Sequence, residues 1–346
     1  MLARSFILYG ATGHTGSLIA RRAVEQGLKP LLVARDALKL DRLARELALD
    51  SLLAPLAHPF ETALGSGAVL LNAAGPFSAT APILQSRAVN AGVHYLDVSG
   101  EAVTFECAAR ENAAAREKGV LMMPGVGFDV VATDCLAAYV ARDLGAVERL
   151  SLAVFGLGPP SRGSARAMIE QAGRPIRVRR QGALANIAPG SEERYFHVEG
   201  ESILAVPISW ADVVTAHFST GASDITVYFE ATPALRFALA ASRTAAAFGA
   251  ASWARELAKA NIGFTPEATD HGDTVRVIAE ASGPRGVRRA RLWTPNVYAV
   301  SADAAVAVTQ RVLSGDFEPG FQTPGRLFGP DFVLSLPGVR RMDSWS

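Results

Sequence analysis

Three glycines near the start of the chain have the type and spacing needed to hold a phosphate group. They lie in the segment Gly10-Ala11-Thr12-Gly13-His14-Thr15-Gly16, between an apolar run and a helical pattern. Glycines so placed permit a tight turn, let the backbone approach a pyrophosphate and bring helix against strand, while the helix N-terminus offers unpaired N–H groups. The alternative is that the glycines form a turn with a structural role only. The predicted dinucleotide-binding residues are Gly10, Thr12, Gly13, His14, Thr15 and Gly16.

The end of the second apolar run indicates which dinucleotide is bound. Enzymes that use NAD usually place an acid here for the ribose hydroxyl, whereas this sequence has Arg35. A guanidinium matches a 2′-phosphate in charge and fork geometry, and Lys39 lies one helical turn further on. NADP is therefore the favoured cofactor. Asp36 leaves NAD open, and the structural alternative is a surface Arg35 paired with nearby acids.

Polar residues also follow three later apolar runs, in the segments Asn72 to Phe77, Tyr95 to Glu101 and Gly125 to Asp129. Ligands of doubly wound folds lie at the carboxyl ends of the strands, so we expect these groups at one edge of a sheet. A simple strand-to-helix connection would also explain the first segment. The residues predicted to run beside the cofactor there are Asn72, Ala74, Gly75 and Pro76.

The elements that must position these groups alternate between short apolar runs and helical patterns, which is typical of a parallel sheet wound on both sides. The expected strands are Ser5–Tyr9, Pro30–Ala34, Leu52–Pro55, Ala68–Asn72, His94–Val98 and Val120–Met123. The expected helices are Ser17–Gln26, Ala37–Ala48, Ala79–Ala91 and Ala102–Lys118. Apolar alternation later predicts strands at Leu150–Phe155, Ile225–Phe229, Thr274–Ala279 and Ala290–Trp293, followed by a helix at Ala302–Leu313.

Seven motifs spread over most of the chain resemble one family. They are Gly10 to Gly16, Asn72 to Phe77, Tyr95 to Glu101, Gly125 to Asp134, Ser161 to Ser164, Pro207 to Asp212 and Thr323 to Pro330. Together they resemble the saccharopine dehydrogenase-like NADP-dependent oxidoreductases, including the short bacterial members related to trans-acting enoyl reductases. The motifs are fairly specific for the family and are not specific for one substrate.

The resemblance implies an α/β fold with an N-terminal Rossmann domain, a doubly wound parallel sheet, and a second mixed α/β (α+β) domain. The Rossmann domain would comprise residues 1–128 and a returning segment, 301–346, and the substrate and oligomerisation domain residues 129–300. In saccharopine reductases the segment equivalent to Tyr95 to Ser99 lines the substrate site, so the resemblance implies that Tyr95, Asp97 and Ser99 are catalytic candidates. The alternative to a catalytic role is that Asp97 only holds its loop in place. Asp134 is interpreted as a cap for a helix beginning near Cys135.

Composition excludes several other classes of protein. With 346 residues and 49% hydrophobic content, the chain can bury a large core shared between two domains. The balance of 34 basic and 33 acidic residues supplies no basic field for nucleic acid. Two cysteines and six scattered histidines show no metal-ligand spacing, so no metal is expected, and the low cysteine count favours a reducing compartment. We expect a cytoplasmic protein because the N-terminal apolar stretch is too short for a signal peptide.

The alanine-rich stretch Ala234 to Ala254 is nearly long enough to span a bilayer, but Arg236 and Arg243 interrupt it. We interpret it as a buried or subunit-interface helix. This interpretation allows a homodimer and disfavours membrane contact. The four arginines at 174, 177, 179 and 180 are interpreted as a solvated strand face, with an acidic substrate as the alternative.

Three functions remain open at this stage. The first is hydride transfer between NADP and a C=C, C=N or C=O bond of a small-molecule or lipid-like substrate. Apolar residues of the second domain, including Trp210, Phe218 and Phe237, favour a lipid-like substrate. The second is a non-catalytic NADP-binding sensor or scaffold. The third is an adaptor that meets a membrane surface through the alanine-rich stretch.

Overall fold

The structure is a computed structural model, and it describes residues 6–60, 68–158, 174–233 and 274–343 together with positions 63, 65, 168, 235, 236, 239 and 240. The chain divides into two compact units. The first contains residues 1–135 and 297–338, and the second contains residues 136–296 and 339–346. The expected returning segment, 301–346, is thus shared: most of it belongs to the first unit and its last eight residues to the second.

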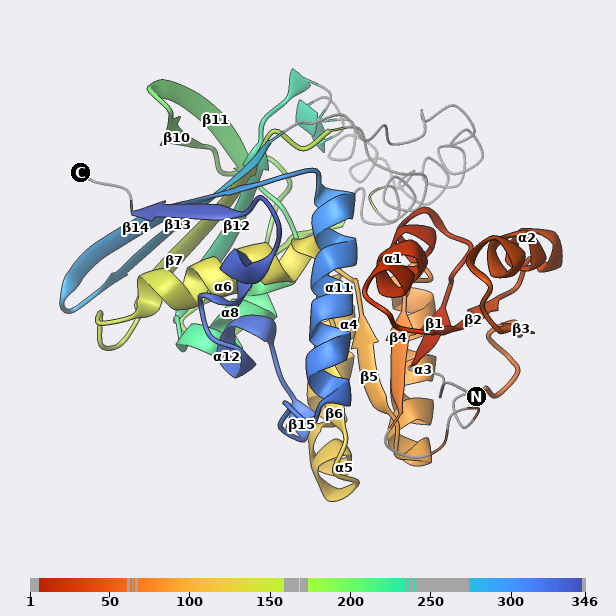
Figure 1. Ribbon diagram of the computed structural model, residues 1–346. Coiled ribbons are helices and arrows are strands. Elements are labelled where there is room, and N and C mark those ends of the chain that lie inside the picture. The colour runs from red at the N-terminus through yellow and green to blue at the C-terminus, as the bar shows by residue number, and fades with distance from the viewer. Residues whose placement is uncertain are drawn as a thin grey trace. The chain divides into compact units, whose positions relative to one another are not determined.

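The first unit is built on a seven-stranded sheet in the order β15-β6-β5-β4-β1-β2-β3, and every neighbouring pair is parallel. Its strands are β1 (Ile7–Tyr9), β2 (Leu31–Ala34), β3 (Ser51–Leu53), β4 (Val69–Asn72), β5 (His94–Asp97), β6 (Leu121–Met123) and β15 (Gly320–Phe321). Strand order reverses between β1 and β4, which is the switch point where doubly wound folds bind their ligands. This is the predicted Rossmann-type sheet (Figure 1).

Helices join these strands and close the unit. They are α1 (His14–Glu25), α2 (Ala37–Leu47), α3 (Phe77–Ala91), α4 (Ala102–Arg110), α5 (Asn112–Glu117), α6 (Phe128–Ala141), α11 (Val297–Leu313), α12 (Pro324–Leu327) and the 3-10 helix η3 (Phe332–Ser335). The helix expected over Ala102–Lys118 is two helices that meet at Glu111. The boundary between the units falls inside α6, after Cys135.

The prediction that Asp134 caps a helix near Cys135 is wrong, because α6 begins at Phe128 and Asp134 lies in its interior. The Asp134 side chain is buried and accepts a hydrogen bond from the Gly325 N–H at 2.7 Å, within the first unit. A Cβ on Gly325 would lie 2.7 Å from that carboxylate, so only glycine permits this approach. Asp134 therefore fastens the start of α12 to α6.

The second unit contains a nine-stranded mixed sheet. Its main path runs β10-β11-β12-β7-β13-β14-β16, with β8 paired to β12 and to β9. Only β12 and β7 are parallel along this path. The strands are β7 (Arg149–Phe155), β8 (Ile176–Arg180), β9 (Ala183–Ile187), β10 (Arg194–Val198), β11 (Glu201–Pro207), β12 (Asp224–Glu230), β13 (Val275–Gly283), β14 (Gly286–Thr294) and β16 (Arg340–Asp343), and the helix packed on β12 and β8 is α8 (Asp212–Thr220).

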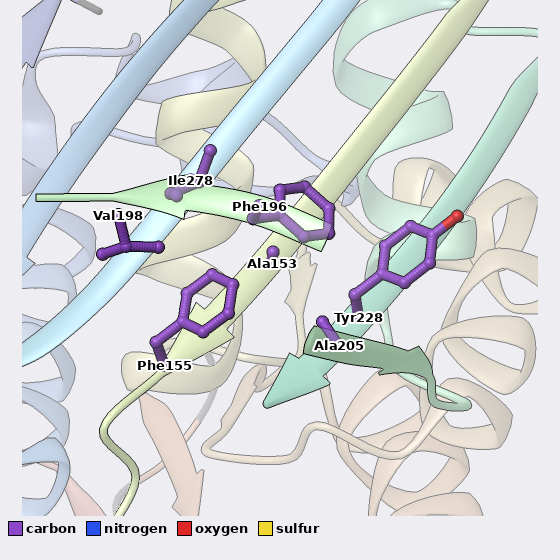
Figure 2. Close-up of a cluster of buried hydrophobic side chains, with 7 residues drawn as sticks. All are labelled: Ala153, Phe155, Phe196, Val198, Ala205, Tyr228 and Ile278. Atoms are coloured by element: carbon purple, nitrogen blue, oxygen red, sulfur yellow. The ribbon is translucent and has the colours of Figure 1, made fainter. Parts of the chain in front are cut away.

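One face of this sheet holds an aromatic core that the β10–β11 hairpin covers (Figure 2). Phe196 of the hairpin packs edge-on against Phe155 and Tyr228, with ring centroids 5.8 and 5.3 Å apart. Ala153 and Ile278, which are register partners, complete the contact from β7 and β13. The alternation of strand residues therefore places one apolar set under the hairpin.

Two earlier predictions lie outside the described residues. The segment Ser161 to Ser164 is one, and all but a few positions of Ala234 to Ala254 are the other. Among the residues that the structure describes, no helix combines the length and apolarity needed to cross a bilayer.

Candidate functional site

The glycine loop has the geometry that each of its glycines was expected to supply. Gly10 has a φ of +82°, and a Cβ there would lie 2.7 Å from the Ala74 nitrogen. A Cβ on Gly16 would lie 2.2 Å from the Gly10 carbonyl oxygen, so this glycine lets α1 pack directly on the turn. Gly13 is exposed and is the N-cap of α1, with no side-chain cap. The first N–H groups of α1 are consequently left for an external acceptor.

Arg35 follows β2 directly and its side chain is exposed. Within the described part of the chain it forms no ion pair, which removes the surface pairing considered from the sequence. Asp36 is instead the N-cap of α2, because its carboxylate accepts from the Lys39 N–H at 3.2 Å. The Lys39 ammonium lies 3.7 Å from the same carboxylate. Asp36, the acid that would favour NAD, therefore caps α2, and Arg35 is the cation at the end of β2.

The turn after β4 is held from inside by Asn72. The Asn72 side-chain oxygen accepts from the Ala74 N–H at 2.9 Å, and the side-chain amide nitrogen donates to Thr80 and Tyr95. Thr80 in turn donates to the Ala74 carbonyl at 2.7 Å. Asn72 is fully buried, whereas Gly75 is exposed. Gly75 thus lies on the outer side of a turn that Asn72 shapes from within.

The three catalytic candidates, Tyr95, Asp97 and Ser99, come together in the first unit and are all fully buried. The Tyr95 hydroxyl donates to one oxygen of Asp97 at 2.8 Å. The other Asp97 oxygen accepts from the Ser99 N–H and the Gly125 N–H, each at 2.9 Å. The Asp97 carboxylate therefore joins the loops after β5 and β6, as its loop-holding alternative requires.

Burial dominates the electrostatics of Asp97. It raises the pKa of this carboxyl to about 6, against the lowering effect of its two backbone donors and of Tyr95. Burial and the neighbouring Asp97 charge also raise the pKa of Tyr95 well above its usual range. The pair is thus a buried hydrogen-bonded unit in which Tyr95 stays protonated.

Sequence reasoning gave no role to two acids at this edge. Burial raises the pKa of Asp129 to about 7, although its surface is only partly covered. A Cβ on Gly100 would lie 2.8 Å from the Asp129 carboxylate, so a glycine permits that approach. Glu101 reaches back to α3, where its two oxygens accept from the N–H groups of Phe77 and Ser78. The sequence placed both acids in segments expected at this edge, Gly125 to Asp129 and Tyr95 to Glu101, but indicated no role for either.

Helix α11 brings the returning segment to the same edge. Its Tyr298 meets the His14 ring of the glycine loop edge-on, with centroids 4.7 Å apart. The Ser301 hydroxyl accepts from the Phe128 N–H at 3.0 Å. Residues some 170 or more positions apart in sequence therefore frame one rim of the first unit.

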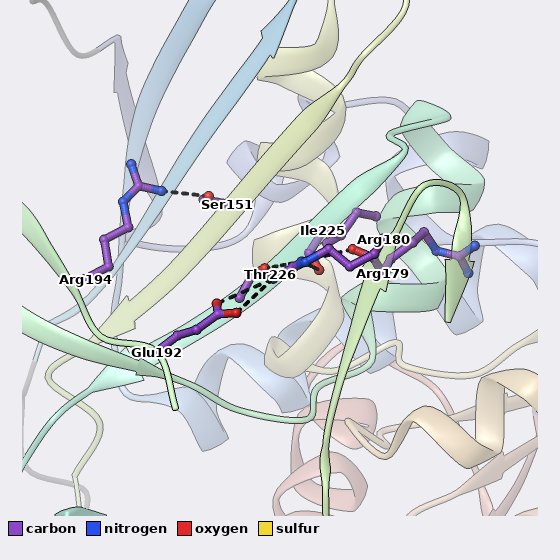
Figure 3. A network of polar contacts seen from close by, with 7 residues as sticks. All are labelled: Ser151, Arg179, Arg180, Glu192, Arg194, Ile225 and Thr226. Atoms are coloured by element: carbon purple, nitrogen blue, oxygen red, sulfur yellow. Dashed lines mark hydrogen bonds and ion pairs between the residues drawn. The ribbon is translucent and has the colours of Figure 1, made fainter. Parts of the chain in front are cut away.

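The prediction of a solvated arginine face is wrong for Arg179 and Arg180 of β8, whereas Arg174 is exposed and Arg177 is half-buried. Arg179 is only 8% exposed and donates to the carbonyls of Val213 and Gly182. Arg180 donates to Thr226 at 2.8 Å and pairs with Glu192 (Figure 3). The side chains turn towards β12 and the start of α8 because β8 pairs with β12, a pairing that a charge count along the chain does not contain.

The residues at the carboxyl edge fit a dinucleotide with a 2′-phosphate. Gly13 is exposed, and a Cβ there would lie 3.3 Å from the Gly10 carbonyl oxygen, which is a tight contact, so a glycine suits this position. The uncapped N-terminus of α1 suits the pyrophosphate. Arg35, with no carboxylate partner among the described residues, suits the 2′-phosphate.

The chain matches no protein-family model and no curated protein. Among solved structures, saccharopine dehydrogenase (L-Glu forming) from Saccharomyces cerevisiae aligns with 99% of this chain and 100% of its own, with TM-score 0.68 and 11% identity. GenD2 from gentamicin A biosynthesis, in complex with NAD, covers 100% of this chain and 98% of its own, with TM-score 0.46 and 15% identity. A myo-inositol dehydrogenase from Corynebacterium glutamicum covers both chains fully, with TM-score 0.44 and 16% identity. The first likeness shows the fold, and the other two are too distant to carry an argument.

Proposed function

We propose that this chain is an NADP-dependent oxidoreductase of the saccharopine dehydrogenase-like type. Its reaction is hydride transfer to a C=C, C=N or C=O bond of a small or lipid-like substrate. One observation carries the proposal: two groups suited to phosphates are present together in the first unit. They are the N-terminus of α1, which has no side-chain cap at Gly13, and Arg35, which has no carboxylate partner in the described part of the chain. The fold that the chain shares with saccharopine dehydrogenase supports it.

The chain's own residues bind and orient the cofactor in this proposal. The N–H groups at the start of α1 hold the pyrophosphate, and Arg35 holds the 2′-phosphate. The turn that Asn72 shapes supports the nicotinamide half at Gly75 and Pro76. When bound, NADPH supplies a hydride, and the proton that completes a reduction comes from the protein or from water.

Asp129 is the best candidate for that proton. The residue is half-buried, and burial of its carboxyl raises the pKa to about 7, so a useful fraction is protonated near neutral pH. The proposal gives a positioning role, not proton donation, to Tyr95, Asp97 and Ser99. All three are buried and hydrogen-bonded to one another or to backbone groups. They hold the loops that present Gly125 and Asp129.

Titration of the purified protein with NADPH and NADH tests the cofactor assignment. We expect NADPH to bind more tightly by about one to two decades, because a charge-assisted contact contributes roughly 1.5–3 kcal/mol. Arg35→Asp should reverse the preference. Arg42→Asp, the same change on the exposed side of α2, should leave it intact. Equal affinities in the unmodified protein would remove the NADP assignment.

Turnover separates an enzyme from a cofactor-binding scaffold. Oxidation of NADPH would be followed across a panel of imines, carbonyl compounds and enoyl thioesters. An enzyme consumes NADPH with at least one of these classes, and Asp129→Asn should then lower kcat at unchanged NADPH affinity. Tight NADPH binding with no turnover across the panel would favour the scaffold.

A further inference from the structure

Glu101 connects two helices that start at the carboxyl edge of the parallel sheet. Its carboxylate accepts from the N–H groups of Phe77 and Ser78, both at 2.9 Å. These are the first two residues of α3, whose own N-cap is Pro76 and provides no side-chain acceptor. The cap of α3 is therefore supplied by a residue 24 positions further along the chain.

The backbone of Glu101 is fixed at the same time, as the N-cap of α4. Its N–H donates to the Ser99 hydroxyl at 3.0 Å, and its carbonyl accepts from the Thr104 hydroxyl at 2.8 Å. Ser99 also accepts from the Thr104 hydroxyl. A carboxylate on so firmly held a residue sets where α3 begins relative to the loop after β5.

The segment between Asn72 and Phe77 is thus anchored at both ends. Asn72 and Thr80 hold Ala74, and the closeness of Gly10 places this peptide directly against the glycine loop. Glu101 holds the far end, just after Pro76. Between the two anchors lies Gly75, which is exposed.

We infer that Glu101 is a positioning residue for the nicotinamide half of the cofactor. It holds the peptide from Gly75 to Phe77, which would support the nicotinamide half when the cofactor binds. The inference rests on the proposed function. It assigns Glu101 no contact with the adenosine half, which Arg35 and the start of α1 hold.

The test compares NADPH with adenosine 2′,5′-bisphosphate, which contains the adenosine half and lacks the nicotinamide. Both would be titrated by calorimetry into the full-length protein and into Glu101→Ala, Glu101→Gln and Glu117→Gln. We expect Glu101→Ala to weaken NADPH about tenfold or more, because two charge-assisted hydrogen bonds are lost, and to change the bisphosphate less than twofold. Glu101→Gln retains one acceptor and should fall between Glu101→Ala and the unmodified protein.

Glu117 is exposed on α5, so its variant controls for the loss of a surface carboxylate and should bind both ligands normally. Equal weakening of the two ligands by Glu101→Gln would indicate a general loss of structure and overturn the inference. Unchanged NADPH affinity in both Glu101 variants would overturn it too. If the unmodified protein binds neither ligand, the proposed function itself fails, which is a different and separately visible result.

Discussion

The carboxyl edge of the parallel sheet and the face of the mixed sheet use their arginines in opposite ways. In the first unit Arg35 is exposed, without a carboxylate partner among the described residues. In the second unit Arg180 contacts Thr226 and Glu192, and Arg194 contacts Ser151 (Figure 3). Arg179 donates to backbone carbonyls, and Arg194 also pairs with Glu280. A cation that the fold leaves unsatisfied is available to a ligand, whereas a satisfied one stabilises the fold.

Removal of one arginine from each unit tests whether the two arginines differ in this way. Arg179→Met should lower the free energy of unfolding by roughly 3 kcal/mol, because the buried carbonyl of Val213 and the carbonyl of Gly182 lose their charged donor. Arg35→Met should change it by less than about 0.5 kcal/mol, as expected for an exposed position. Chemical denaturation gives both values. NADPH affinity should fall in Arg35→Met and stay nearly unchanged in Arg179→Met. A comparable loss of stability in both variants would contradict the proposed difference between the two arginines.

Prediction from sequence succeeded where the signal is local and failed where it is not. The glycine loop lies between β1 and α1, and Arg35 lies between β2 and α2, so each belongs to a short strand-turn-helix unit whose spacing alone placed it at the edge of the sheet. Arg179 reaches a carbonyl 34 residues away, and Glu101 caps a helix that begins 24 residues before it. Those partners become neighbours only through strand pairing and helix packing, which periodicity along the chain does not encode.

A second test uses the buried carboxylate at the edge. Because the pKa of Asp97 is about 6 in the folded chain and about 3.9 when unfolded, the folded state binds more protons between these values. This group should therefore reduce stability by roughly 2–3 kcal/mol as pH rises from about 4 to 6. Tyr95 and Glu101 face the same carboxylate; Tyr95 stays protonated throughout this range.

Asp97→Asn should flatten that part of the stability profile, because asparagine does not titrate and its amide can still bond Tyr95, Ser99 and Gly125. Thermal unfolding midpoints measured from pH 4 to pH 7 would show this. Asp41→Asn, which removes an exposed carboxylate paired with Arg45, should keep the profile of the unmodified protein. An unchanged slope in Asp97→Asn would show that the carboxylate is not the buried group inferred here.

A third test compares glycines from the two units. Gly16→Ala places a Cβ 2.2 Å from the Gly10 carbonyl oxygen, so α1 must shift away from the turn. Overpacking of this kind costs about 1–3 kcal/mol, and we expect NADPH affinity to fall about thirtyfold. Gly182→Ala meets nothing within 4 Å but has a φ of +78°. It should lower stability by roughly 1 kcal/mol through backbone strain and leave NADPH binding unchanged.

The smallest expected effect concerns Lys39, whose ammonium lies 3.7 Å from Asp36 on the exposed first turn of α2. Exposed charges contribute about 0.2–1 kcal/mol and are screened by salt. If Lys39 also supports the 2′-phosphate beside Arg35, Lys39→Ala should weaken NADPH two- to threefold at low salt, leave NADH unchanged, and lose its effect near 1 M salt. Arg45→Ala removes a comparable exposed pair with Asp41 later in the same helix and should not alter either cofactor. Equal small losses for both variants would assign the effect to the general charge of α2 and leave Arg35 as the sole proposed contact with the 2′-phosphate.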